Sequence, residues 1–186
     1  MRDWGISPRD RAEGDVQLIL DCTEMKIAQP IDPILQQMTY SNYKGTNTMK
    51  TLVGIDSKGM VNFVSDAYGG CYSDRAILEK SGVLDHLCPG DVLLVDRSFH
   101  IEDMCAARGL VVNAPASLRG RTQLTPKERL NSSLLSSKRI HVERVIGLAK
   151  TYRMLKHELH QSKLVLGSRI IYVCFMLANL RFQIVK

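Results

Sequence analysis

The sequence predicts a mixed α/β fold built around one central sheet. Apolar runs of strand length alternate with helical patterns in the order strand, hairpin, helix, strand, helix, strand and then helices, which is typical of a sheet covered by helices. The 186 residues are 45% hydrophobic and 24% charged, ordinary globular values that exclude wholesale disorder. At roughly 150 residues per domain, this length corresponds to a single domain.

The chain opens with a polar, charged stretch. Residues 1–14 lack the apolar segment that directs secretion and predict a loose lead-in, so the domain is expected to occupy residues 15–186. From Asp15 onward apolar and polar residues alternate, which predicts a first strand that ends at Asp21.

A polar segment and a hairpin are expected next. The segment 29–48 contains Pro30 and Pro33, which we expect to keep it irregular. Two apolar runs, 51–55 and 61–65, follow, and the residues D-S-K-G between them predict a hairpin by their turn chemistry.

Helices and strands then alternate through the middle of the chain. Ser73 is the expected N-cap of the first helix, and the continuous apolar run that follows it suits a strand buried on both faces. The expected elements are a helix over 73–86, a strand over 92–95, a helix over 101–108 and a strand over 110–114.

The C-terminal third is expected to be a loop, containing at most one helix, followed by two helices. Residues 115–137 show no clear period, whereas 138–156 have a strong helical period and 164–182 form a last apolar helix. No apolar run reaches the about 18 to 20 residues that a membrane span needs, and the longest candidate, 170–180, is too short.

Charge and cysteine content restrict the class of protein. The 25 Lys and Arg exceed the 19 Asp and Glu, giving a net charge of +6, which favours an anionic partner such as nucleic acid. The five cysteines are odd in number, widely spread and form no C-x-x-C pair, which predicts reduced thiols in an intracellular protein and no zinc site.

Two aspartates close predicted strands. Asp21 ends the first strand and Asp96 follows the buried run 92–95. Ionised carboxylates resist burial unless they are paired or bind metal, so two of them on separate strands of one sheet point to a site. A turn or a helix cap is the alternative for each of them.

A glutamate on a helix is the third candidate. At roughly 100° per residue, Glu143 lies just beyond the apolar face of the helix 138–156, with Arg139 and Lys150 on nearly the same bearing. An intrahelical ion pair is the alternative. Together the three carboxylates supply the hard oxygen ligands that Mg²⁺ or Mn²⁺ prefers, and two such ions about 4 Å apart can activate water at a phosphodiester.

Basic residues near these acids are candidate contacts to a phosphate backbone. Each has a solvated surface or loop as its alternative, and so has Tyr43. The candidates on the predicted helix and its continuation are Arg139, Arg144, Lys150 and Arg153, and those elsewhere are Lys44, Lys50, Arg119 and Arg121. The histidines at 100, 141, 157 and 160 have no metal-like pairing and are expected to be structural.

Six short motifs occur in an order that is similar to a known family. The motifs are D-C-T-E (21–24), S-N-Y-K-G-T-N-T-M-K (41–50), A-Y-G-G (67–70), S-D (73–74), L-V-D-R-S-F (94–99) and R-I-H-V-E-R (139–144). Over about residues 15–182 the chain resembles the DDE superfamily endonuclease domain of PIF/Harbinger-type transposases. The resemblance implies an RNase H-like fold in which Asp21, Asp96 and Glu143 bind divalent metal, Mg²⁺ or Mn²⁺, to cut and rejoin DNA strands. Asp74 falls in another motif, as a neighbouring acid or as a helix cap beside Ser73.

The sequence departs from the family pattern in two ways. Ser98 stands where glycine is expected, and a requirement for positive φ there would strain the turn that carries Asp96. No DNA-recognition module is visible, so an isolated catalytic domain, a fragment or a domesticated relic is expected, with DNA recognition by a separate protein or domain.

Three hypotheses follow for function. The first is a metal-dependent nuclease or strand-transfer domain, the second a catalytically silent protein that binds DNA or another protein, and the third a basic domain whose acids are structural. A nuclear location is inferred from the family and the basic charge, no membrane association is expected, and an oligomer is allowed.

Overall fold

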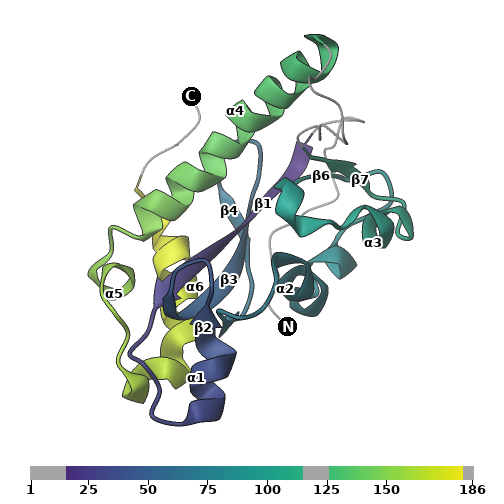
Figure 1. Cartoon of the computed structure of the whole chain (residues 1–186). Helices are drawn as coiled ribbons and strands as arrows, with labels where there is room; N and C mark the ends of the chain where they lie inside the picture. Colours follow the sequence, from purple (N-terminus) through teal and green to yellow (C-terminus); the bar gives the residue numbers. More distant parts are fainter. Residues whose placement is uncertain (1–15, 115–125, 182–186) are drawn as a thin grey trace.

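A curled mixed sheet runs through the centre of the computed structural model, which describes residues 16–114 and 126–181 (Figure 1). The main path of the sheet is β2-β3-β1-β6-β7, and β4 and β5 also pair with β3. β1 is antiparallel to β3 and parallel to β6, and β6 is parallel to β7. The strands are β1 (Val16–Lys26), β2 (Tyr40–Ser41), β3 (Thr46–Ile55), β4 (Val61–Val64), β5 (Tyr68–Gly69), β6 (Val92–Leu94) and β7 (Val111–Asn113).

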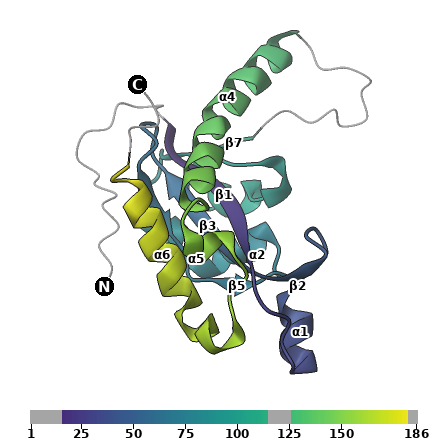
Figure 2. The same cartoon turned by 90° about the vertical axis from the view of Figure 1, so that its left-hand side faces the viewer.

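Helices cover both faces of this sheet (Figures 1 and 2). The α-helices are α1 (Pro33–Thr39), α2 (Asp74–Ser81), α3 (Glu102–Ala106), α4 (Pro126–Ala149), α5 (Arg153–Lys156) and α6 (Gly167–Ala178), with 3-10 turns at Val83–His86, Arg97–Phe99 and Gln161–Leu166. Alternation along β1 divides the core: Ile19 packs with α4 and α6, whereas Leu18 and Leu20 pack with α2 and α3. The predicted α/β class with a helix-flanked mixed sheet is confirmed, and the arrangement is compatible with the RNase H-like fold.

The middle of the chain follows the sequence prediction closely. The hairpin 51–55/61–65 is present, and the Asp56 carboxylate accepts the backbone N–H groups of Lys58 and Met60 at 2.9 Å. The helix predicted over 73–86 is divided into α2 and a 3-10 turn because Gly82 adopts φ 71° between them.

The first strand is longer than predicted. β1 continues past Asp21 to Lys26, because this half pairs with β3 from Asp21–Val53 to Lys26–Thr48. On the other side β6 ends beside Ile19, and the chain around Leu159 pairs with the end of β1 by donating its N–H to the Lys26 carbonyl at 2.9 Å. The prediction that Asp21 ends a strand is therefore wrong.

The polar segment 29–48 is also more regular than predicted. Pro33 begins α1, where a missing N–H costs nothing, and the Asp32 side chain caps the helix by accepting Ile34 N–H at 2.8 Å. None of the α1 side chains is buried, so no apolar period in the sequence could indicate this helix.

Helix α4 begins at Pro126, well before the predicted start at 138, and ends at Ala149. Its N-terminal half extends beyond the sheet, whereas Val142, Val145 and Ala149 of the C-terminal half pack on it (Figures 1 and 2). Only the packed half carries the helical period that the sequence showed. Tyr152 is extended (φ −65°, ψ 132°) and separates α5 from α4, so the predicted helix 138–156 is interrupted.

The last predicted helix consists of the 3-10 turn 161–166 and α6. Gln161–Ala178 is long and apolar enough, by length and composition alone, to cross a membrane, contrary to the prediction that no run is. A core helix passes the same test, and α6 buries Ile171 and Phe175 against the sheet. Gly167 lies so close to Met49 that a Cβ there would stand 2.6 Å from its sulfur.

Candidate active site

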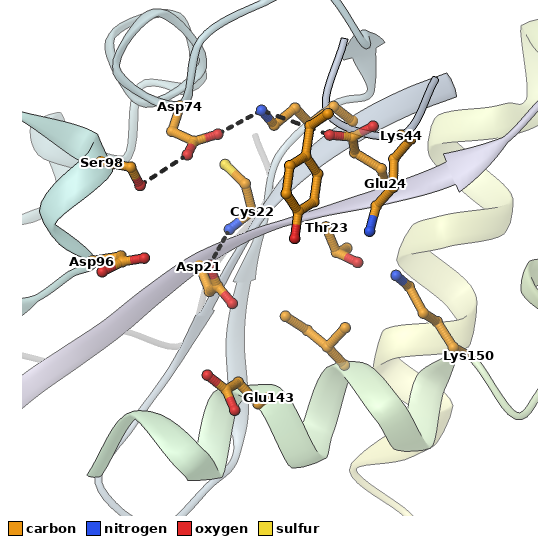
Figure 3. Close-up of a pocket in the computed structure, with 13 residues that line it drawn as sticks. Asp21, Cys22, Thr23, Glu24, Lys44, Asp74, Asp96, Ser98, Glu143 and Lys150 are labelled. Carbon is orange, nitrogen blue, oxygen red and sulfur yellow. Dashed lines mark hydrogen bonds and ion pairs between the residues drawn. The ribbon is translucent and has the colours of Figure 1, made fainter. Parts of the chain in front are cut away.

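An open pocket of about 580 Å³ lies where β1, β3, α2, α4 and the turn after β6 meet. It holds an unusual share of charged side chains, of both signs. The lining residues are Asp21, Cys22, Thr23, Glu24, Tyr43, Lys44, Lys50, Asp74, Asp96, Ser98, Glu143, Ile146 and Lys150 (Figure 3).

The sheet register brings Asp21 and Asp96 to this pocket. β1 and β6 are parallel, and their last pair is Ile19–Leu94. Each aspartate lies two residues beyond that pair, so both side chains point to the same face as Ile19 and Leu94, the face that α4 covers. Both carboxylates therefore line the pocket near the end of β6.

Glu143 reaches the same pocket from α4. Its neighbour Val142 is buried against the sheet, which places Glu143 at the edge of the packed face, as predicted. In Figure 3 the Glu143 and Asp21 carboxylates face a common space, with Asp96 beside it. The structure thus brings the three predicted acids to one pocket.

Arg139, one turn before Glu143, is the cation between these acids. Its Nη1 lies 3.2 Å from Asp96 Oδ1, and its Nη2 lies 3.8 Å from Glu143 Oε1. Asp96 also caps the 3-10 turn 97–99 by accepting Arg97 N–H at 2.7 Å. The helix cap and the intrahelical ion pair, which were the alternatives for Asp96 and Glu143, are therefore both present.

The Asp21 carboxyl is electrostatically unusual. Burial raises its pKa from 3.8 to about 6, because removal from water disfavours the charged form, while the Arg139 guanidinium and the Cys22 N–H act in the opposite direction. The Cys22 N–H donates to Asp21 Oδ1 at 2.9 Å. The surroundings of Asp21 supply too little positive charge to offset its burial, and a bound cation could supply the rest.

A second acidic pair shares the pocket with Lys50. The Lys50 ammonium lies 2.6 Å from Asp74 Oδ1 and 3.9 Å from Glu24 Oε1, and the Thr48 hydroxyl donates to Glu24 at 2.8 Å. Burial of the ammonium opposes its charge, but the hydrogen bond and charge of Asp74 prevail and raise the pKa of Lys50.

The structure favours one of the two alternatives for Asp74 and adds an acid that the sequence analysis missed. Ser73 caps α2 by accepting Ala76 N–H at 3.2 Å, so Asp74 faces the pocket instead of capping the helix. Glu24 was not singled out, although it stands in the D-C-T-E motif that carries Asp21.

Ser98 fits its turn. Among the described residues the only non-glycine residue with positive φ is His100, so Ser98 is not strained. Its hydroxyl donates to Asp74 Oδ2 at 3.2 Å, a contact that glycine could not make. The departure from the family pattern therefore links the turn after Asp96 to α2.

The other predicted basic residues divide into two groups. Lys44, Lys50 and Lys150 line the pocket, and burial, followed by the charge of Lys44, lowers the pKa of Lys150. Arg144 is exposed on α4, and Arg153 lies in a separate groove between α5 and α6. Arg119 and Arg121 lie outside the described residues.

Tyr43 stands at the tip of the β2–β3 hairpin, 84% exposed, with the Lys44 ammonium 4.5 Å from the centre of its ring. None of the four predicted structural histidines lines the acidic pocket. All five cysteines are free thiols.

The donor set fits a hard divalent cation, because it consists of carboxylates from two adjacent strands and one helix. Within residues 16–114 and 126–181, however, no three acidic, His or Cys side chains are close enough to hold a metal ion as they stand. The Arg139 guanidinium contacts two of the three carboxylates, those of Asp96 and Glu143.

Comparison with known families gives a match over most of the chain. The sequence profile of the family described as DDE superfamily endonuclease matches residues 20–179, most of the chain. No curated protein and no solved structure matches. The chain belongs to the DDE superfamily endonuclease family.

Proposed function

We propose that this DDE superfamily endonuclease is the divalent-metal-dependent DNA cleavage and strand-transfer domain of a Harbinger-like transposase, in its original or a domesticated form. The observation that carries the proposal is the position of two aspartates, each two residues beyond the last pair of adjacent parallel strands, opposite a glutamate on α4. This arrangement gathers three oxygen donors from distant parts of the sequence at one open pocket.

Asp21, Asp96 and Glu143 would hold Mg²⁺ or Mn²⁺. When bound, such a cation supplies a polarised water and stabilises the leaving oxygen of a phosphodiester. The raised pKa of Asp21 supports this role, because a buried acid without a full counter-charge gains most from a cation.

The basic residues around the pocket would orient the DNA. Lys44 and Lys150 line it, and no acidic partner of either is found within the described ranges. Arg144 and Arg153 are candidates for more distant phosphates, and the exposed ring of Tyr43 could stack on a base. A separate protein or domain would supply sequence recognition, and the protein would act in the nucleus, as a monomer or an oligomer.

The test is cleavage of end-labelled duplex DNA in Mn²⁺ and in Mg²⁺. Asp21→Asn, Asp96→Asn and Glu143→Gln should each abolish cleavage, whereas Glu79→Gln, on an exposed part of α2, should cut as the parent does. Calorimetric titration of Mn²⁺ should show binding by the parent and none by the Asp21→Asn/Asp96→Asn double variant. Triad variants that cut as well as the parent would refute the site.

The alternative function is a catalytically silent DNA- or protein-binding domain. The Arg139 contacts favour it, because they neutralise part of the acid cluster without a metal. This form predicts salt-sensitive DNA association that persists in EDTA and weakens when Lys44 and Lys150 are replaced by Gln. DNA binding without any cleavage would support the alternative.

A further inference from the structure

A cation that belongs to the chain lies beside the carboxylate pocket and pairs with two of its acids. Arg139 contacts Asp96 and Glu143, and its charge also acts on Asp21. Its side chain is only 17% exposed, whereas those of Asp96 and Glu143 are 40% and 58% exposed. A largely enclosed guanidinium therefore faces carboxylates that remain open to solvent.

The contacts of Arg139 are loose in comparison with another pair in the same chain. Arg75 and Asp103 form a two-pronged pair, with nitrogen to oxygen distances of 2.8 and 2.6 Å. The Arg139 distances, 3.2 and 3.8 Å, go to two different carboxylates, and its buried Nε has no hydrogen-bond partner among the described residues. Arginine in this position gains charge neutralisation without the geometry that makes such pairs strong.

A divalent cation and a guanidinium need the same carboxylate oxygens. The Asp96 oxygen nearest Arg139 also accepts the Arg97 N–H, so this oxygen is already occupied on two sides. While Arg139 stays in place, its positive charge also repels an incoming cation over a short distance. The two occupants therefore exclude one another.

We propose that Arg139 is an internal counter-ion that occupies the cation position in the metal-free protein and must leave Asp96 and Glu143 before Mg²⁺ or Mn²⁺ binds. The inference rests on the proposed function, since it requires these carboxylates to be metal ligands. Arg139 is thus a positioning residue that neutralises Asp96 and Glu143 without metal and lowers the metal affinity of the free protein.

The test compares Mn²⁺ affinity by calorimetry in the full chain and in an Arg139→Gln variant. Removal of the competing charge should tighten the dissociation constant about tenfold or more. Lys138→Gln, which removes the same charge from the neighbouring exposed position, is the matched control and should leave the affinity within about twofold. Arg139→Lys should fall between the parent and Arg139→Gln, because one ammonium cannot pair with both carboxylates.

Thermal unfolding provides a readout that does not depend on catalysis. The metal-free Arg139→Gln protein should melt below the parent, and saturating Mn²⁺ should raise its melting temperature more than that of the parent. Arg139→Lys retains the charge, so it serves the same comparison if Arg139→Gln does not fold.

The outcomes separate this inference from the proposed function. Unchanged or weaker Mn²⁺ binding by Arg139→Gln, with a parent that binds, overturns the role of Arg139 and leaves the metal site standing. Absence of binding in both proteins, or binding that survives Asp21→Asn in the Arg139→Gln background, overturns the proposed metal site itself.

Discussion

Two groups of charges at the pocket each contain one basic side chain, one aspartate and one glutamate, but in different surroundings. In one, Lys50 lies between Glu24 and Asp74, with side-chain exposures of 13%, 7% and 19%. In the other, Arg139 lies between Asp96 and Glu143, with exposures of 17%, 40% and 58%. The first group is largely enclosed among β1, β3 and α2, whereas the acids of the second are more open to solvent.

The difference in burial indicates which of the two groups stabilises the fold and which can exchange its cation. A buried carboxylate that loses its counter-ion cannot be compensated by water, so the Lys50 group must stay intact for the fold. Water and salt can replace an exposed partner at little cost, so the Arg139 group can exchange its cation. The Lys50 group is therefore a fixed part of the structure, whereas the Arg139 group can exchange its cation.

The largest effect is expected at the buried group. Lys50→Met should lower the free energy of unfolding by about 3 kcal/mol, because it leaves the largely enclosed carboxylates of Glu24 and Asp74 without a counter-charge. Lys150→Met, at a lysine of the same pocket with no ion pair among the described residues, should lower it by less than about 1 kcal/mol. Urea unfolding measures both, and equal losses would remove the distinction between the two groups.

Replacement of Asp21 should stabilise the fold, whereas replacement of Lys50 should destabilise it. Its pKa is about 6 in the folded protein and near 4 in the unfolded chain, so the folded state binds more protons between these values. Stability should therefore fall as the pH rises from about 4 to 6, and the cost is fully present above that range. Asp21→Asn should raise the free energy of unfolding at neutral pH by about 2 kcal/mol and flatten this dependence.

Urea titrations at acidic and neutral pH measure the Asp21 effect. Asp96→Asn, which loses an ion pair with Arg139 instead, is the control and should not stabilise the protein. Stability of Asp21→Asn that is below the parent at neutral pH would contradict the burial argument.

The ion pairs of Arg139 should contribute less to stability than those of Lys50. Arg139→Gln should lower the free energy of unfolding of the metal-free protein by about 1 kcal/mol or less, and the loss should shrink in high salt. A loss as large as that of Lys50→Met, insensitive to salt, would mean that Arg139 belongs to the structural part of the pocket.

The smallest effect is expected at Ser98. Ser98→Gly should lower the free energy of unfolding by about 0.5 kcal/mol, because it removes the Asp74 contact and adds freedom to the unfolded chain. A stabilising Ser98→Gly would instead mean that this turn prefers the glycine of the family pattern. Urea unfolding beside Ser98→Ala, which removes only the hydroxyl, separates the two contributions.

Much of the framework was predictable because burial leaves a period in the sequence. The hairpin, the strand before Asp96 and the packed half of α4 all alternate or repeat against the core. Helix α1 and the N-terminal half of α4 show no hydrophobic period, because α1 buries no side chain and the start of α4 extends beyond the sheet.

The candidate site was predicted in part. The three acids were identified from their positions, and they stay a prediction that the cleavage assay tests. Glu24 was missed because the sequence analysis ended β1 at Asp21, and the pairing of this polar half with β3 depends on residues far along the chain.

The sequence by itself determined which residues alternate, which are buried and where carboxylates interrupt apolar runs. Only the tertiary structure decided which cation neutralises which acid, because Lys50 meets Asp74, and Arg139 meets Asp96, across separate elements of the fold. Local patterns fix the direction of a side chain relative to its own strand or helix. Charge pairing depends on distance in space and on burial, which no local pattern records.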